Sequence, residues 1–268
     1  MPEPEMVHTP GGPFLMGTHD EQVEWLVQHL GEARVWQQKG HFSREQPQHQ
    51  VILASYEIGR YPVTVGEYRA FVDAGGYRQR SYWTDGGWAW RNARGIITPQ
   101  WWESERWAGD DRLPVIGVSW FEVLAYCHWL SAATSGSYRL PTEAQWEKAA
   151  RGRDGRLYPW GNEPDPPRSN TRTSGTGHTL PVGHDSPAGD SPYGCAEMAG
   201  NASEWTMTQY RPYPYQENDG RNDVAREAER VIRGGSWFKP LLRARVTARG
   251  MNDPSFRDHD IGFRLVRG

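Results

Sequence analysis

The sequence predicts a mixed α+β protein in which loops join short helices and strands. The 268 residues include 30 glycines and 20 prolines, which make turns frequent, and 14 tryptophans, which are large groups for a core. Helical and strand periodicity is short wherever it occurs. We therefore expect a large core held among loops rather than stacked regular layers. Length alone allows one large domain or two small ones.

Short strands are expected near the N-terminus, on either side of a less regular stretch. Residues 6–17 predict a strand, a Gly-Gly-Pro turn and a second strand, and the apolar residues of 51–58 predict a pair of strands that ends before Pro62. Between them, residues 21–38 alternate charged and bulky apolar side chains. That stretch is either a helix or an ordered insertion.

Three helices share one N-terminal signal, a hydroxyl residue followed three positions later by Glu or Gln, which predicts a reciprocal capping box. The pairs are Thr64 with Glu67, Ser119 with Glu122, and Thr142 with Gln145. The helices are expected to end at Gly75-Gly76, near Gly136 and at Gly152. Their apolar stripes, which include Cys127, are expected to pack into the core.

Residues 76–113 form a Trp-rich segment between the first two of these helices. Its six tryptophans are Trp83, Trp88, Trp90, Trp101, Trp102 and Trp107. They either form a wall on which a ligand stacks or fill the space beneath a long loop.

Charge and hydropathy argue against several functional classes. The net charge of −3 gives no field directed at nucleic acid or an anionic membrane, and no apolar run approaches the ~18 residues of a membrane span. The first residues lack the basic and apolar regions of a signal peptide. Two cysteines, Cys127 and Cys195, are too few for a disulfide scaffold or a thiolate cluster. We expect a cytoplasmic monomer that binds no nucleic acid and has no membrane span.

A tight turn near residue 200 is a candidate metal site. Glu197 and Glu204 lie seven positions apart, with Gly200-Asn201 between them. Such a turn can direct two carboxylates and several carbonyls at one hard cation, since calcium takes roughly six to eight oxygen ligands. The alternative is a solvated turn with two ordinary glutamates.

Seven segments occur in an order and at spacings that are specific only when taken together. They are PVTVGEYRAFV, PVIGVSWFEVLAYCHWLS, YRLPTEAQWEKAARG, YPWGNE, GNASEWT, RGGSW and IGFRLV. In series they resemble the formylglycine-generating enzyme (sulfatase-modifying factor) family. The resemblance implies that family's C-type-lectin-like fold, a loop-rich α+β single domain over residues 1–268. Residues 76–113 would then be an insertion in it.

The cysteines of the family's enzymes are missing from this chain. The resemblance implies two copper-binding cysteines a few residues after the GGSW turn, but residues 238–268 contain none. A second branch, the iron-dependent sulfoxide synthases of thiohistidine biosynthesis, takes its metal-binding histidines from an additional N-terminal helical domain, for which we expect no room here. We therefore expect no copper or iron. An oxidoreductase with a cysteine-independent metal site is the alternative function.

The family resemblance supports a cation at the turn near residue 200. The family segment that matches GNASEW holds a structural calcium, which implies ligands from Glu197 and Glu204 and from the carbonyls of Gly200 and Ala202. This chain keeps oxygen ligands at all four positions. It departs from the family in having Glu where Asp or Asn is commoner and Ser203 where an aromatic residue is usual. We expect Ca²⁺ in a structural role.

Residues 231–268 are called here the C-terminal segment. The segment begins with a β-branched strand and a Gly-Gly turn and ends with an apolar strand over 261–266. About twenty-five irregular residues lie between these strands, and such long loops are most often functional. Their pattern resembles the variable region of diversity-generating retroelement target proteins, which are bacterial proteins of this same fold. The resemblance implies a diversified binding surface made of Phe238, Lys239, Pro240, Leu241, Leu242, Val246, Gly250, Met251, Asn252, Asp253, Phe256, Asp258, His259 and Asp260.

Five arginines of the C-terminal segment are expected to be its fixed frame, pairing with buried carboxylates or carbonyls. They are Arg243, Arg245, Arg249, Arg257 and Arg264. The resulting hypothesis is a non-enzymatic binding protein with a macromolecular or glycan ligand. A degenerate scaffold that only mediates assembly is a third possibility.

Overall fold

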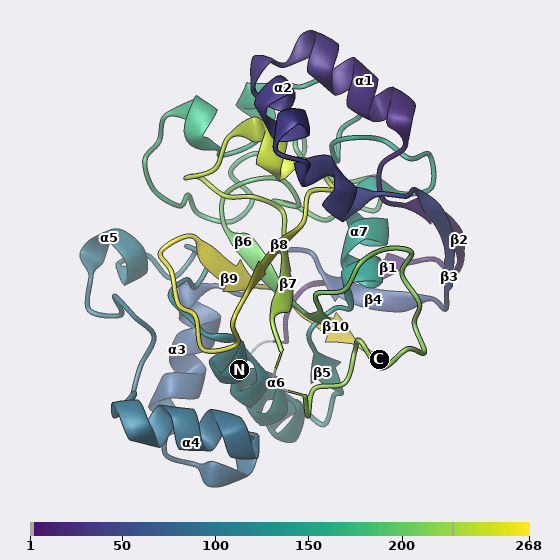
Figure 1. Cartoon of the computed structure of the whole chain (residues 1–268). Coiled ribbons are helices and arrows are strands. Elements are labelled where there is room, and N and C mark those ends of the chain that lie inside the picture. Colours follow the sequence, from purple (N-terminus) through teal and green to yellow (C-terminus); the bar gives the residue numbers. More distant parts are fainter. Residues whose placement is uncertain (1–2, 227) are drawn as a thin grey trace.

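A computed structural model describes residues 3–226 and 228–268 and arranges them as three small sheets among helices and long loops (Figure 1). The strands are β1 (Met6–Thr9), β2 (Gly12–Met16), β3 (His49–Leu53), β4 (Tyr56–Gly59), β5 (Tyr138–Arg139), β6 (Ser203–Gln209), β7 (Arg230–Arg233), β8 (Gly250–Asn252), β9 (Ile261–Phe263) and β10 (Val266–Arg267). The α-helices are α1 (Asp20–His29), α2 (Gly31–Gln38), α3 (Val65–Asp73), α4 (Asp85–Arg94), α5 (Glu105–Ala108), α6 (Trp120–Thr134) and α7 (Glu143–Arg151). The α+β prediction is confirmed.

A four-stranded sheet of order β8-β7-β6-β9 lies at the centre of the molecule, with β6 parallel to β9 and antiparallel to β7 (Figure 1). The other sheets have the orders β1-β4-β10-β5 and β2-β3. Helix α6 packs against α3, α4 and β5, while α7 packs against β2, β6 and β7. Helices α1 and α2 lie at the opposite end of the molecule from α4 (Figure 1).

The strands predicted at 6–17 and 51–58 are present, but those at 51–58 do not pair with each other. β3 runs antiparallel to β2, and β4 runs antiparallel to β1. Strands β2 and β3 share the same alternation of buried and exposed residues, so both turn their apolar side chains to one face. The uncertain stretch 21–38 forms the two helices α1 and α2.

The three predicted capping boxes all form. Thr64, Ser119 and Thr142 each accept a hydrogen bond from the backbone N–H three residues later, and the Glu or Gln there returns one. Helix α6 is apolar on most sides because it is covered by α3, α4 and β5. Cys127 lies inside α6 and is buried, as predicted.

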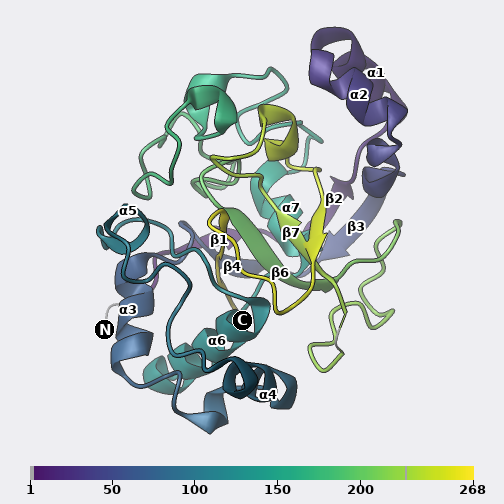
Figure 2. The same ribbon diagram turned by 60° about the vertical axis from the view of Figure 1, so that its left-hand side comes forward.

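The C-terminal segment crosses the front of the central sheet in Figure 2, where it contributes β7, β8 and β9. The turn at Gly234 and Gly235 has φ angles of 91° and 66°, which favour glycine at both positions. The irregular middle also contains the 3₁₀ helix η5 (Leu241–Ala244) and strand β8, neither of which was predicted. The single strand predicted over 261–266 is two strands in different sheets, β9 and β10.

No described helix combines the length and the apolar character that crossing a bilayer requires.

Candidate binding site on the C-terminal segment

A cavity of about 380 Å³ opens on the C-terminal segment, which supplies fourteen of the sixteen residues that line it. Strands β7, β8 and β9 form its floor through Ile232, Met251 and Ile261 among others. Arg44 from the 3₁₀ helix η1 (His41–Glu45) and Ser203 from β6 are the two residues contributed from elsewhere. The segment therefore forms nearly the whole wall of a concave site.

Four of the five predicted frame arginines are paired with buried carboxylates. The pairs are Arg245 with Glu45, Arg249 with Glu143, Arg257 with Glu122, and Arg264 with Glu204, at nitrogen–oxygen distances between 2.5 and 2.9 Å. Every one of these carboxylates lies outside the segment, so the pairs tie it to distant parts of the chain. The prediction that these arginines pair with buried carboxylates is confirmed for these four.

Arg233 of β7 completes the buried network beneath the cavity. Its guanidinium contacts Glu143 and Glu147, and it also donates to the backbone carbonyl of Thr247. Burial alone would raise the pKa of Glu143, but Arg249 and Arg233 outweigh it and hold that pKa below its ordinary value. The carboxylate is therefore the form that the fold stabilises.

Arg243 is the exception among the five. Its guanidinium lies over the ring of Trp36, 4.0 Å from the ring centroid, and no carboxylate of the described residues lies within salt-bridge distance. It is half-buried and lines the cavity beside Arg44. The prediction that Arg243 pairs with a buried carboxylate or carbonyl is wrong within the described residues, since its guanidinium lies on an aromatic face instead.

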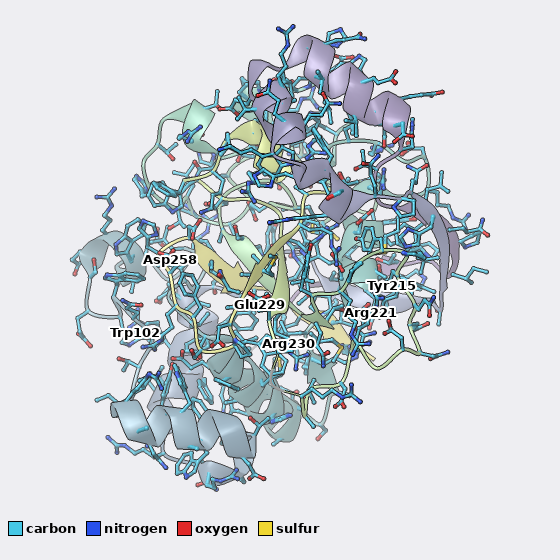
Figure 3. The ribbon with its side chains drawn as sticks, in the orientation of Figure 1. Trp102, Tyr215, Arg221, Glu229, Arg230 and Asp258 are labelled. Carbon is cyan, nitrogen blue, oxygen red and sulfur yellow. The ribbon has the colours of Figure 1, made fainter. Side chains whose placement is uncertain are left out.

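Seven of the fourteen predicted surface residues line the cavity. They are Lys239, Gly250, Met251, Asn252, Phe256, Asp258 and Asp260. Outside the cavity, Phe238 and Asp253 are exposed, and Pro240 and His259 are half-buried. In Figure 3, Asp258 lies on the side of the segment that faces α5.

Four of the predicted surface residues are buried and do not belong to an exposed surface. Leu241 and Leu242 of η5 pack into a core cluster with Val23, Leu26 and other apolar residues. Val246 is fully buried in a second cluster. Asp260 is 1% exposed and accepts a hydrogen bond from Ser236 Oγ at 2.7 Å. The prediction erred here because the segment enters the core at η5, at Val246 and directly before β9.

The six tryptophans of the Trp-rich segment fall into two groups. Trp83 and Trp90 are buried in the largest core cluster, and Trp88 and Trp102 pack against it. These four fill space between α4, α3 and α6, and Trp102 is marked in Figure 3. The filling interpretation is confirmed for them.

Trp101 and Trp107 lie instead beside the C-terminal segment. The ring of Trp107 is 5.6 Å from that of Trp237 and 5.8 Å from that of His259, and Trp101 is 5.9 Å from His259. Phe238 joins the group at 5.4 Å from His259 and is 48% exposed. The aromatic surface next to the cavity therefore combines two tryptophans of the Trp-rich segment with residues of the C-terminal segment.

The whole chain, residues 1–268, matches the sulfatase-modifying factor enzyme 1-like domain. The chain belongs to this family. Its similarity to PvdO from Pseudomonas aeruginosa has a TM-score of 0.71 at 28% identity, covering 98% of this chain and 94% of that one. The similarity to Treponema denticola variable protein 1 has a TM-score of 0.67 at 20% identity, again covering 98% and 94%. The predictions of the family and of its C-type-lectin-like fold are confirmed.

A curated relative in this sulfatase-modifying factor family is the hercynine oxygenase of Mycolicibacterium thermoresistibile. It is 38% identical over 249 residues, which cover 83% of this chain and 53% of the relative. The chain spans a little over half the length of the three hercynine oxygenases that it matches. Similarity to them therefore concerns one part of those proteins.

The cysteines are placed unlike a pair that binds copper. Cys127 lies inside α6 in one core cluster and Cys195 lies in another. Burial raises the pKa of Cys127 to about 12 and also raises the pKa of Cys195, so both remain thiols at neutral pH. Neither thiol reaches the cavity on the C-terminal segment.

The four residues predicted to bind calcium do not fit as one set. Both oxygens of Glu204 accept hydrogen bonds from Arg264 at 2.7 Å, and Trp146 Nε1 donates to one of them at 2.6 Å. A cation at Glu204 would meet the positive charge of Arg264. The sequence pattern indicated Glu204 as a possible ligand, but it could not show that Arg264, sixty residues later, is its partner. Gly200 and Ala202 lie in the same buried turn.

Glu197 alone of the four keeps a free carboxylate oxygen. Its Oε1 accepts a hydrogen bond from the Gly183 N–H at 2.6 Å, while its buried Oε2 has no partner among the described residues. Burial raises the pKa of Glu197 to about 7. A structural calcium ion at this turn stays a prediction, with Glu197 as the side chain that suits it.

A second cluster of possible metal ligands is formed by Asp258, His259 and Asp260. Their potential ligand atoms lie within 4.8 Å of one another. His259 Nδ1 lies 2.8 Å from Asp258 Oδ1, and Lys239 Nζ lies 3.4 Å from Asp260 Oδ2. The contacts link His259 to Asp258 and Asp260 to Lys239, although the buried His259 Nδ1 makes no hydrogen bond with a described residue.

Proposed function

We propose that the chain is a non-enzymatic binding protein whose ligand sits in the cavity and on the adjoining exposed residues of the C-terminal segment. The observation that carries the proposal is the cavity itself, since fourteen of its sixteen lining residues come from that one segment. Binding sites are typically concave and mostly preformed. Mixed charged, apolar and aromatic side chains at its edge suit a macromolecule or a glycan.

The proposal includes a diversified surface, as in the variable proteins of diversity-generating retroelements. Its support is the separation of two sets of residues within the segment. Arg245, Arg249 and Arg264 are buried with carboxylate partners, whereas Phe238, Met251 and other proposed contact residues are exposed or half-buried. Exposed residues away from such networks change stability little when replaced, usually by about 0.5 kcal/mol or less. The surface can therefore change while the frame holds the fold.

Two matched libraries test this separation. The first randomises Phe238, Lys239, Met251, Asn252, Phe256 and Asp258, and the second randomises Leu241, Leu242, Val246 and Asp260. Protease resistance of displayed chains measures folding. Most members of the first library are expected to fold and most members of the second to unfold. Equal unfolding in both libraries would show that the exposed residues are part of the core and would refute the proposal.

Binding is tested with a glycan array and the chain carrying alanine at the six positions of the first library. The wild-type chain is expected to bind a subset of glycans that the alanine variant does not bind. A reverse transcriptase gene beside this gene, with a near-copy of the coding region for residues 231–268, would support diversification. Its absence would restrict the proposal to a binding site of fixed sequence.

A second candidate function is an oxidoreductase related to the hercynine oxygenases, favoured by the 38% identity to one of them. In this case the cavity would be one part of an active site, because the chain matches only 53% of that relative. Oxygen consumption by the iron-loaded chain that depends on added hercynine would support the enzyme. No such consumption, with glycan binding intact, would favour the binding protein.

A further inference from the structure

Arg44 and Arg243 are two cationic residues of the cavity wall that form no salt bridge with a carboxylate of the described residues. Both line the cavity, and neither makes a side-chain salt bridge within 4.0 Å in the described part of the chain. Arg44 takes part through its backbone carbonyl, which accepts a hydrogen bond from Arg249 at 2.8 Å. Arginine is the usual partner for planar oxyanions. Two guanidinium groups without a salt bridge on one cavity therefore point to an anionic ligand.

A buried ion pair holds the two arginines on the same cavity wall. Arg245 and Glu45 form a bidentate pair with both nitrogen–oxygen distances at 2.9 Å. Glu45 directly follows Arg44, and Arg245 lies two residues after Arg243. The pair therefore joins the end of η1 to the end of η5 and brings Arg44 and Arg243, about two hundred positions apart in the chain, to the same cavity.

Trp36 of α2 supports the guanidinium of Arg243. The ring centroid lies 4.0 Å from the guanidinium carbon. An aromatic face stabilises a guanidinium by a cation–π contact and restricts its plane, while the N–H groups around its edge stay available. The Arg243 guanidinium forms no hydrogen bond with another described residue, so its N–H groups can donate to a ligand.

The charges around the two arginines are consistent with this interpretation. Burial and the nearby charges of Arg44 and Arg245 lower the pKa of Arg243, against the opposing effect of Glu45. Burial and the charges of Arg44 and Arg243 also lower the pKa of His41. With Arg245 neutralised by Glu45, the charges of Arg44 and Arg243 remain, and an anion between them would relieve their repulsion.

Two aspartates of the cavity limit the negative charge that a ligand can carry. Asp258 and Asp260 also line the cavity, and Lys239 is already paired with Asp260 at 3.4 Å. A ligand with several negative charges along its length would meet these aspartates. A single oxyanion at one end of a larger ligand avoids them, which argues against nucleic acid and other polyanions.

We propose that the cavity binds a ligand through one oxyanion, a carboxylate, sulfate or phosphate group, held between the guanidinium groups of Arg44 and Arg243. This inference rests on the proposed binding function and names the chemistry of its ligand. Acidic sugars and the carboxylates of peptides both carry such a group. The remaining parts of the ligand would extend toward Met251 and Phe256 on the cavity wall.

Isothermal titration calorimetry with the full chain at neutral pH tests the oxyanion site. Sodium phosphate, sodium sulfate and sodium acetate are the probes, with sodium chloride at equal ionic strength as the reference. At least one of the three oxyanions is expected to bind with a saturable heat, and their order of affinity identifies the group that the site prefers. No saturable heat above chloride for any of them would overturn the proposal.

Arg243→Gln and Arg44→Gln are each expected to weaken binding of the preferred probe by roughly tenfold or more, since each removes charge-assisted hydrogen bonds. Arg34→Gln is the matched control, because Arg34 is an exposed arginine of α2 that does not line the cavity. Melting temperatures of all three variants check folding. Equal weakening by Arg34→Gln, or none by the two cavity variants, would overturn the proposal.

The outcome separates the oxyanion site from the wider function. Oxyanion binding that depends on Arg243, together with no glycan or other ligand recognised by the exposed residues, would leave this site standing and refute the proposed binding surface. If the wild-type chain binds glycans and neither Arg243→Gln nor Arg44→Gln changes that binding, the binding surface would stand and the oxyanion site would be refuted.

Discussion

The buried pair of Arg245 and Glu45 should be the most informative single contact in the C-terminal segment. Both side chains are 1% exposed or less, and both guanidinium–carboxylate distances are 2.9 Å. Arg245→Met leaves the Glu45 carboxylate buried without its counter-charge, a change that costs about 3–5 kcal/mol in comparable pairs. The double variant Arg245→Met/Glu45→Leu removes both charges, so it should lose clearly less than the sum of the two single variants.

Urea denaturation followed by far-UV circular dichroism measures the free energy of unfolding of each variant. Arg267→Met is the control, since Arg267 and its partner Glu57 are 36% and 38% exposed, and such pairs contribute about 0–1 kcal/mol. If Arg245→Met falls within about 1 kcal/mol of wild type, or if the double variant is additive, the buried pair does not anchor the segment.

Two more predictions concern the turn near residue 200. Burial raises the pKa of Glu197 from 4.5 to about 7, so between these pH values the native state binds a proton that the unfolded state releases. The free energy of unfolding therefore falls by up to about 3 kcal/mol as the pH rises from 4.5 to 7. Glu197→Gln should remove this fall, which is measured as the difference in melting temperature between pH 5 and pH 8 with a chelator present. Equal differences for the wild type and the variant would contradict the prediction. Glu204→Ala should destabilise the chain by about 3–5 kcal/mol, equally with calcium and with a chelator, because Arg264 loses its buried partner. Stabilisation by calcium that Glu204→Ala abolishes would instead restore Glu204 as a ligand.

Local signals were sufficient for α3, α6 and α7, but α4 and α5 were not predicted and α1 and α2 were left open. A capping box satisfies backbone groups within four residues, so Thr64, Ser119 and Thr142 could be recognised as helix starts without knowledge of the tertiary structure. Strand pairing could not be recognised in the same way. The alternation of β3 shows which side chains face the core, but it does not show that β2, rather than β4, is the partner.

The candidate site shows the same limit. The sequence indicated that the arginines of the C-terminal segment need partners, but each carboxylate lies between 60 and 200 residues away. Nothing in the local pattern distinguishes Arg243, which has Trp36 beneath it, from Arg245, which has Glu45. The burial of Leu241 and Leu242 was also missed, since η5 is a single turn too short to show helical periodicity.

The burial pattern restricts what a diversified segment could vary. Leu242 and Val246 are at most 2% exposed, and a polar residue at either position would be buried without a hydrogen-bond partner, a change that costs several kcal/mol. Asp260 accepts a hydrogen bond from Ser236 and contacts Lys239, so only a residue with a similar oxygen can replace it. Functional copies of the segment should therefore differ mainly at exposed positions such as Phe238 and Phe256 and keep apolar residues at 242 and 246. Sequencing such copies checks this, and free variation at positions 242 and 246 would show that the segment packs differently from this structure.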